Sequence, residues 1–371
     1  MRILYGVCGE GMGHAVRSAV AVRHLLMAGH DLTVLAGSRP AAEYLRFQVG
    51  FGAEVIQTLG AQAVYDDSSV DVPKTLAANA LRAGLAPLAN AAASLATLAR
   101  PPDVVVSDFD SLSAYMAARL DKPLVALDNI HFGNRCSHAP ENCRPEDDRA
   151  HALFRLVADR TVPGARRYMV LAMHRPASML PQTSLHLPIL RDEVIGMEHG
   201  HSDTGPVVAY HNAHADHARL IQAYCESGLP VRVYGVPGHA QTSTGSVRCL
   251  SFDDRRFLGD LSRARFVVGG AGFTLLSEAL YLGKPVLAVP YGLQYEQLLN
   301  ASYLERAGWG RRCNRLSAHA LRRFADDAAH MREVIKEQAP RSWDNDECLG
   351  ALEQALLFES GAGRASGMVT A

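Results

Sequence analysis

The chain has 371 residues, 48% of them hydrophobic, and its formal net charge is −1. This length and composition suit two globular domains, each large enough to bury its own core. The near-neutral charge lacks the basic excess that nucleic acid binding requires, so nucleic acid is excluded as a partner.

The chain shows no export or membrane-spanning signal. Its first apolar run is interrupted by Gly9, Glu10 and Gly11, which is unlike a signal peptide. The most apolar stretch, residues 76–98, contains polar residues and a proline. Seven scattered cysteines indicate reduced thiols. We therefore expect a soluble cytoplasmic protein.

Apolar runs alternate with helical patterns along the chain, which predicts parallel sheets covered on both faces. In the first half the expected strands are 3–7, 32–36, 53–56, 104–107, 124–127 and 168–172, and the expected helices are 14–28, 40–48, 74–99, 111–120 and 146–160. We assign residues 1–195 to a first Rossmann-like domain, 196–205 to a linker, 206–358 to a second such domain and 359–371 to a disordered tail. The predicted fold class is α/β, with two doubly wound domains facing each other across a cleft.

A glycine-rich segment follows the first predicted strand and precedes a helix. A dinucleotide fingerprint would need a small residue at position 14 and an acid after the next strand, but the chain has His14 and Gly37–Ser38 there. A dinucleotide is therefore not expected. The segment instead puts a histidine at a helix N-terminus.

A second glycine-rich segment follows the strand expected at 266–268. It comprises Gly269, Gly270, Ala271, Gly272, Phe273 and Thr274. Glycines allow positive φ, and the N–H groups that begin the next helix can hold a phosphate. Glu278 follows one turn after Thr274, where a carboxylate suits ribose hydroxyls. The alternatives are an ordinary strand-to-helix turn and a glutamate that only favours the helix dipole.

At this point the chain resembles the GT-B glycosyltransferases that use nucleotide sugars. The resemblance depends on Gly269–Thr274 with Ser277–Leu280, then on Gly283–Val286, Pro290–Tyr291 and Glu296–Ala301. The loop Gly9–Ser18 is similar to the acceptor-side loop of the UDP-glucuronosyltransferases and of the GlcNAc transferase that makes the peptidoglycan lipid precursor. The match is nearest to a bacterial and archaeal family of uncharacterised glycosyltransferases.

The resemblance implies roles for named residues. The loop 269–274 would bind the donor diphosphate, Glu278 the ribose, Glu296 and Gln297 the sugar, and Ser251 and Phe252 the base. On the acceptor side it implies Gly11 and Gly13. The loop 131–149 is also expected on the acceptor side, with Asn129 and His131 at the cleft, and Arg17 is a candidate for a phosphate of the donor or acceptor. For Glu296 and Gln297 the alternative is a solvated helix start, and for Arg17 a helix-surface arginine.

The reaction implied is displacement of a nucleoside diphosphate from the anomeric carbon by an acceptor hydroxyl. Neutral His14 suits the base, and Asp108 at the end of a strand is similar to the acid that orients it. Asp110 competes for that role, and either carboxylate can instead cap the helix near Ser111. Neither a cofactor nor a metal is required, because helix dipole and amides can stabilise the leaving group.

Retaining GT-B enzymes commonly show two glutamates separated by seven residues around the glycine-rich segment. Here Glu278 is present but position 270 is glycine, so inversion is favoured. Two other functions stay open: a UDP-sugar epimerase, and a non-catalytic nucleotide-sugar-binding protein. The UDP-sugar would be a co-substrate and the acceptor a polysaccharide, lipid or small molecule. Contact with the inner face of a membrane, through residues 76–98, also stays open.

A histidine-rich region lies near the second domain's first strand. It contains His199, His201, His211, His214 and His217, but no carboxylate or cysteine completes a metal ligand set there. Cys136, His138 and Cys143 are likewise not spaced as a zinc site. We therefore predict no metal.

Overall fold

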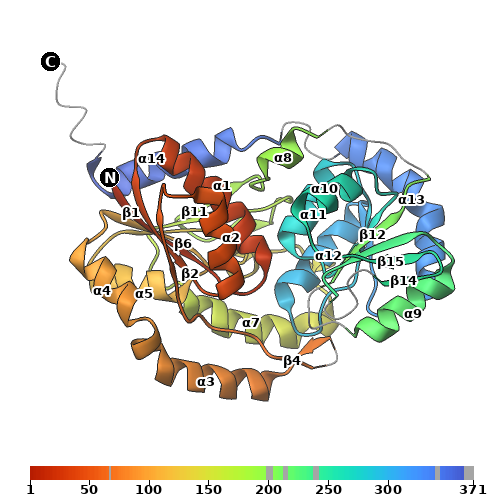
Figure 1. Ribbon diagram of the computed structural model, residues 1–371, viewed down its shortest axis with the longest axis horizontal. Helices are drawn as coiled ribbons and strands as arrows, with labels where there is room; N and C mark the ends of the chain where they lie inside the picture. The colour runs from red at the N-terminus through yellow and green to blue at the C-terminus, as the bar shows by residue number, and fades with distance from the viewer. Residues whose placement is uncertain (67, 198–203, 212–215, 237–241, 339–342, 363–371) are drawn as a thin grey trace.

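The computed structural model describes residues 1–66, 68–197, 204–211, 216–236, 242–338 and 343–362. Two seven-stranded sheets form the centres of two layered α/β units (Figure 1). The predicted α/β fold class is confirmed. Among the described residues, no helix combines the length and apolarity needed to cross a bilayer.

The N-terminal sheet is parallel throughout, in the order β11-β9-β7-β6-β1-β2-β3. Its strands are β1 (Arg2–Val7), β2 (Asp31–Ala36), β3 (Glu54–Gln57), β6 (Val104–Asp108), β7 (Leu124–Asp128), β9 (Arg167–Leu171) and β11 (Thr183–His186). Its helices are α1 (Met12–Met27), α2 (Arg39–Val49), α3 (Val72–Ala89), α4 (Ala91–Ala99), α5 (Ser111–Arg119), α6 (Phe132–Arg135) and α7 (Asp148–Thr161). The short helix α8 (Asp192–Ile195) follows, and its Val194 packs in a core of the C-terminal sheet. Two small antiparallel pairs join the hairpin strands β4 (Tyr65–Asp66) and β5 (Ser69–Val70), and the sequence-distant strands β8 (Cys136–Ser137) and β10 (Ser178–Met179).

The C-terminal sheet has the order β14-β15-β13-β12-β16-β17-β18, and only β14 is antiparallel. Its strands are β12 (Val207–Tyr210), β13 (Val231–Tyr234), β14 (Thr242–Thr244), β15 (Val247–Cys249), β16 (Val267–Gly269), β17 (Val286–Ala288) and β18 (Gly310–Arg312). Its helices are α9 (His217–Ser227), α10 (Asp254–Ser262), α11 (Phe273–Tyr281), α12 (Tyr295–Arg306) and α13 (Ala318–Gln338).

The strand order reverses once in each sheet. In the N-terminal sheet the reversal lies between β1 and β6, and in the C-terminal sheet between β12 and β16. Ligands bind at such switch points, beyond the carboxyl ends of the strands. The two glycine-rich segments follow β1 and β16, so both lie at switch points.

Strand side chains alternate between the two faces of each sheet, as expected for strands covered on both sides. Ile3, Tyr5 and Val7 join one core, whereas Leu4 joins the core on the opposite face. The second core also contains Tyr295, Leu298, Leu299 and Tyr303 of α12, which therefore packs across the domain boundary. The two units are thus in close contact.

The last helix does not follow the predicted domain boundary. Residues up to 358 were expected in the C-terminal domain, but α14 (Asp346–Glu359) packs on the N-terminal core through residues such as Leu352 and Leu356. Figure 1 shows α14 beside α1. The reason is that α14 has an apolar face, which packs against the apolar core of the N-terminal sheet. Of the expected tail, residues 363–371 lie outside the described residues, as do 198–203 of the expected linker.

The helix expected at 74–99 is two helices. Asn90 ends α3 and precedes α4, and its side-chain Oδ1 accepts a hydrogen bond from the Leu59 amide at 2.7 Å. Pro87, inside α3, removes a backbone donor near this break. None of the residues of α3 is buried.

Candidate active site

Close packing shapes the loop after β1. The Cys8 amide donates to the Asp108 carbonyl at 3.0 Å, which extends the pairing of β1 with β6. A side chain at Gly9 would collide with the Gly37 backbone, and Gly11 caps α1 with a φ of 77°. His14 therefore falls in the first turn of α1, with its side chain 12% exposed.

His14 contacts Asp108 at the switch point. Its Nδ1 lies 2.8 Å from Oδ1 of Asp108, which ends β6 and is fully buried. The same carboxylate accepts hydrogen bonds from Arg17 Nε at 2.9 Å and Ser18 Oγ at 2.8 Å. Burial alone would raise the pKa of the Asp108 carboxyl, but Arg17 and His14 outweigh it and hold that pKa below its usual range.

The proton on His14 follows from these contacts. Nδ1 also lies 2.7 Å from Arg17 Nη2, which can only donate. Nδ1 cannot donate to Asp108 and accept from Arg17 at once. Because Asp108 is ionised and Arg17 Nη2 already donates to its Oδ1 at 2.5 Å, we assign the proton to Nδ1. Nε2 then carries the lone pair, as a general base requires.

Asp110 was the second carboxylate that the sequence analysis considered for orienting His14. Its Oδ2 accepts a hydrogen bond from the Ser113 amide at 2.7 Å and so caps α5. Asp108, and not Asp110, is the carboxylate against His14.

The cap should show a distinct pH dependence. Burial raises the pKa of Asp110 to about 6. Its stabilising contribution is therefore complete below its unfolded pKa, near 4, and is lost as the pH rises through about 6. Asp110→Asn keeps a cap without titrating, so the variant should gain on the order of 2–3 kcal/mol relative to wild type between pH 4 and 7. Urea unfolding at several pH values measures this, and a pH-independent difference would refute it.

Arg17 is neither on the helix surface nor turned toward a ligand. Arg17 is only 3% exposed, and its Nη1 donates a hydrogen bond to Asn129 Oδ1 at 2.5 Å. Asn129 Nδ2 in turn donates to Glu296 Oε1, in the opposite domain, at 2.9 Å. Burial raises the pKa of Glu296, and His14 and Arg17 oppose this. Arg17 and Asn129 thus join His14 to a predicted sugar-binding residue.

His131 is not at a cleft. It is 1% exposed, and its Nδ1 lies 2.7 Å from Asp128 Oδ2. Its ring packs edge-on against Phe109 and Tyr168. This enclosure by Asp128, Phe109 and Tyr168 is at odds with the expected cleft position.

The loop 269–274 forms the start of α11. Ala271 has a φ of 63°, a region that residues with a side chain rarely adopt, and its carbonyl accepts from Asn300 Nδ2 at 3.1 Å. No side chain caps the N-terminus of α11 at Gly272. The N–H groups of the first turn are therefore available to an anion.

Gln297 and Gly270 lie together beneath this loop. Gln297 Oε1 accepts from the Tyr291 amide at 3.2 Å, and a Cβ at Gly270 would lie 3.0 Å from that oxygen. Glu296 accepts from Asn300 Nδ2 at 2.7 Å. The predicted diphosphate and sugar residues thus form one contiguous group.

The two glycine-rich loops touch each other. Thr274 Oγ1 donates to the Gly13 carbonyl at 3.2 Å, and this contact joins the two domains. His14, next to Gly13, therefore lies directly opposite the N-terminus of α11.

This contact predicts an effect for Gly13→Ala. A Cβ at Gly13 would lie 2.8 Å from Thr274 Oγ1, so the Thr274 side chain must turn away or the loops must separate, at a cost of about 1–3 kcal/mol. Adding Thr274→Ala removes the clashing hydroxyl and should restore part of the loss. A double-mutant cycle on unfolding free energies tests this, and purely additive effects would contradict the contact.

Glu278 is enclosed, which the sequence did not anticipate. Its residue is 1% exposed, and its two oxygens accept from Arg191 Nε at 2.7 Å and Nη2 at 2.6 Å. Arg191 also donates to Asp254 Oδ1 at 2.8 Å. Arg191, in the segment that connects the two domains, thus forms the hydrogen bonds to Glu278 that the sequence analysis assigned to a ribose.

The predicted base loop follows β15. Phe252 is 49% exposed, and its ring packs edge-on against Tyr210 and tilted against Phe257. Ser251 is half-buried beside it. An exposed aromatic ring on a packed support is suited to contact a base.

The histidine-rich region is only partly described. His199, His201 and His214 lie outside the described residues. His211 is 3% exposed with Nε2 2.6 Å from the Tyr224 hydroxyl, and burial lowers its pKa to about 3. His211 is thus a buried neutral side chain.

The chain is similar to known proteins both in sequence and in fold. The sequence model of glycosyl transferase family 1 matches residues 1–328. No curated protein matches by sequence. The fold resembles the calicheamicin glycosyltransferase CalG4, at 18% identity and a TM-score of 0.58, over 91% of this chain and 92% of that one.

Two further solved structures contain nucleotide ligands. LpCGTa in complex with UDP shares 14% identity at a TM-score of 0.61, over 96% and 99% of the two chains. UGT2 of Phytolacca americana, complexed with UDP-2fluoro-glucose and pterostilbene, shares 14% sequence identity at a TM-score of 0.59, over 91% of this chain and 93% of that one. At such identities these likenesses establish the fold. Together with the family match, they show that the chain belongs to glycosyl transferase family 1 and has the GT-B fold.

Proposed function

We propose that the protein transfers a sugar from a UDP-sugar to an acceptor hydroxyl, with inversion and without a metal. The observation that carries the proposal is the contact between Gly13 and Thr274, which brings the His14–Asp108 pair opposite the uncapped N-terminus of α11. UDP and a UDP-sugar analogue in two solved structures of this fold support the donor class.

In this mechanism His14 Nε2 takes the proton of the acceptor hydroxyl while its oxygen attacks the anomeric carbon. The bond from that carbon to the diphosphate breaks on the opposite face, so one displacement inverts the centre. Amides of residues 272–274 stabilise the leaving diphosphate. Asp108 holds the Nδ1 proton and stabilises the imidazolium that forms.

The donor is held mainly by the C-terminal domain in this proposal. Glu296 and Gln297 bind the sugar hydroxyls, and Ser251 and Phe252 border the base. Glu278 reaches the ribose if donor binding draws an oxygen away from Arg191, since a carboxylate accepts up to about four hydrogen bonds. The acceptor approaches from the side of Gly11 and His14.

Any contact with a membrane surface belongs, in this proposal, to α3. Its Leu76, Leu81 and Leu88 are 67%, 68% and 82% exposed, and residues 72–102 contain no acidic side chain. Sedimentation with anionic lipid vesicles tests this contact, and protein that stays in the supernatant rejects it.

A thermal-shift screen followed by a turnover assay tests the function. A ligand that binds only the folded state raises the melting temperature, so UDP and UDP-sugars should stabilise the protein more than ADP, GDP or NAD. Release of UDP should require an acceptor. Interconversion of UDP-sugars without an acceptor would indicate an epimerase, and binding without any turnover a sensor.

A further inference from the structure

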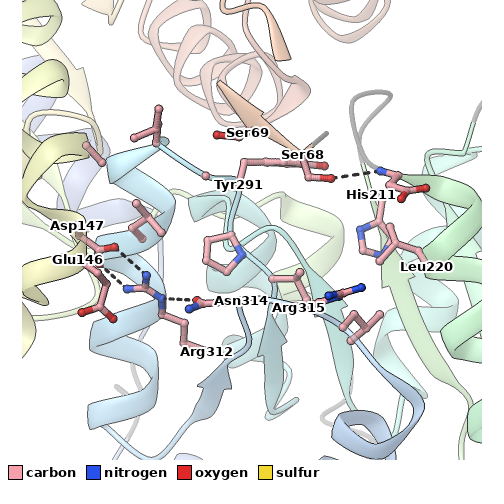
Figure 2. Close-up of a pocket in the computed structure, with 18 of the residues that line it drawn as sticks. Ser68, Ser69, Glu146, Asp147, His211, Leu220, Tyr291, Arg312, Asn314 and Arg315 are labelled. Carbon is pink, nitrogen blue, oxygen red and sulfur yellow. Dashed lines mark hydrogen bonds and ion pairs between the residues drawn. The ribbon is translucent and has the colours of Figure 1, made fainter. Parts of the chain in front are cut away.

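A cavity lies between the domains, apart from the site described above. It has a volume of about 410 Å³ and opens at the carboxyl ends of β12, β17 and β18 (Figure 2). From the N-terminal domain its wall includes Ser68 and Ser69, and from the C-terminal domain Arg219 and Arg315. His14, Glu278 and the loop 269–274 are not among the described residues that line it.

The acidic side chains on this wall already have partners. Asp147 forms an ion pair with both Arg312 Nη atoms, at 2.5 and 2.8 Å. Glu146 lies 3.7 Å from Arg144, and Asp216 caps α9 by accepting from the Arg219 amide at 3.2 Å. Figure 2 shows the Arg312 contacts on one side of the cavity.

Two arginine side chains on this wall, Arg219 and Arg315, have no carboxylate partner among the described residues. Arg219 Nη2 is buried and has no hydrogen-bond partner, an expensive condition for a charged donor. Arg315 is exposed, and among the described residues neither arginine forms an ion pair with a carboxylate. Arg219 also lies in the first turn of α9, whose N-terminus favours negative charge.

The remaining wall is largely apolar. Leu220, Leu298 and Leu316 line it, and its volume falls in the range of small-molecule sites, roughly 300–1,000 Å³. We propose that this cavity binds an organic anion, with Arg219 and Arg315 holding its phosphate or carboxylate and the leucines contacting an apolar body.

The cavity borders the donor site through one segment. Tyr291 lines it, while the Tyr291 amide donates to Gln297 and its ring would lie 3.2 Å from a Cβ at Gly270. The hairpin of β4 and β5 holds this segment, because Val70 donates to the Gly292 carbonyl and Gly292 to the Ser68 carbonyl, each at 2.9 Å. An occupant thus contacts both domains and the segment behind the sugar residues.

Phenyl phosphate, which joins a phosphate to an apolar ring, is the probe. Isothermal titration calorimetry in saturating UDP should show it binding with the donor cradle occupied. Arg219→Gln should weaken binding about tenfold or more, because a charge-assisted contact is lost. Arg315→Ala should act in the same direction and, being exposed, leaves folding intact. Arg323→Ala, an exposed arginine on α13, is the control and should bind as wild type.

Equal affinity in wild type, Arg219→Gln and Arg315→Ala would overturn the proposal, as would absence of binding at millimolar probe. The comparison of variants also works if UDP itself does not bind. Failure of the donor assignment is therefore distinguishable from failure of this site.

Discussion

His14→Ala should slow sugar transfer by about 10²–10⁴-fold, the usual contribution of a positioned general base. Its affinity for UDP should not change, because the proposed contacts of UDP lie on loop 269–274 and on the C-terminal domain. The measurement is kcat from UDP release under saturating donor and acceptor, alongside the Kd for UDP from calorimetry.

The matched control is His24→Ala, a histidine on the same helix that lies 3.5 Å from Glu353 and away from the loops. It should transfer sugar at the wild-type rate. If His14→Ala keeps full kcat, or if it loses UDP binding and transfer together, His14 is not the base.

Arg191→Ala should have the largest effect on stability, a loss of about 3–5 kcal/mol in unfolding free energy. The substitution leaves the Glu278 carboxylate buried without its two charge-assisted hydrogen bonds. Urea denaturation monitored by circular dichroism measures the change.

The double variant Arg191→Ala with Glu278→Gln should recover part of that loss, because no buried charge is then left unpaired. Arg39→Ala, in an exposed pair with Glu43, should leave the unfolding midpoint unchanged. An Arg191→Ala midpoint equal to that of Arg39→Ala would show that the buried pair contributes nothing.

The Arg191–Glu278 pair lies next to the segments that connect the two domains. Arg191 follows Leu190, whose amide and carbonyl both bond the Asn345 side chain, at 2.9 and 2.8 Å. The two segments that connect the domains, one through Leu190 and Arg191 and the other through Asn345, therefore meet next to Glu278. A ribose that competes for Glu278 would act on this junction.

Much of the fold was predictable because its strands are continuous apolar runs. The segments 3–7, 104–107 and 124–127 were each found to within one or two residues of β1, β6 and β7. By contrast β11 (Thr183–His186) and β18 (Gly310–Arg312) lie at sheet edges, where polar residues are tolerated and the apolar signal is lost. Both were missed.

The site was predictable only in part, for a related reason. Glycines and a histidine at strand ends mark the loops locally, so the positions of His14 and loop 269–274 followed from short motifs. The enclosure of Glu278 by Arg191, 87 residues away, and the burial of Arg17 against Asn129 depend on tertiary packing. No local pattern distinguishes such arginines from surface ones.

A crystal structure with UDP tests the central claim most directly. We expect the diphosphate to accept hydrogen bonds from the main-chain amides of residues 272–274, with its terminal phosphate facing His14. UDP bound elsewhere, for example in the cavity beneath Ser68, or with its phosphates away from α11, would contradict it.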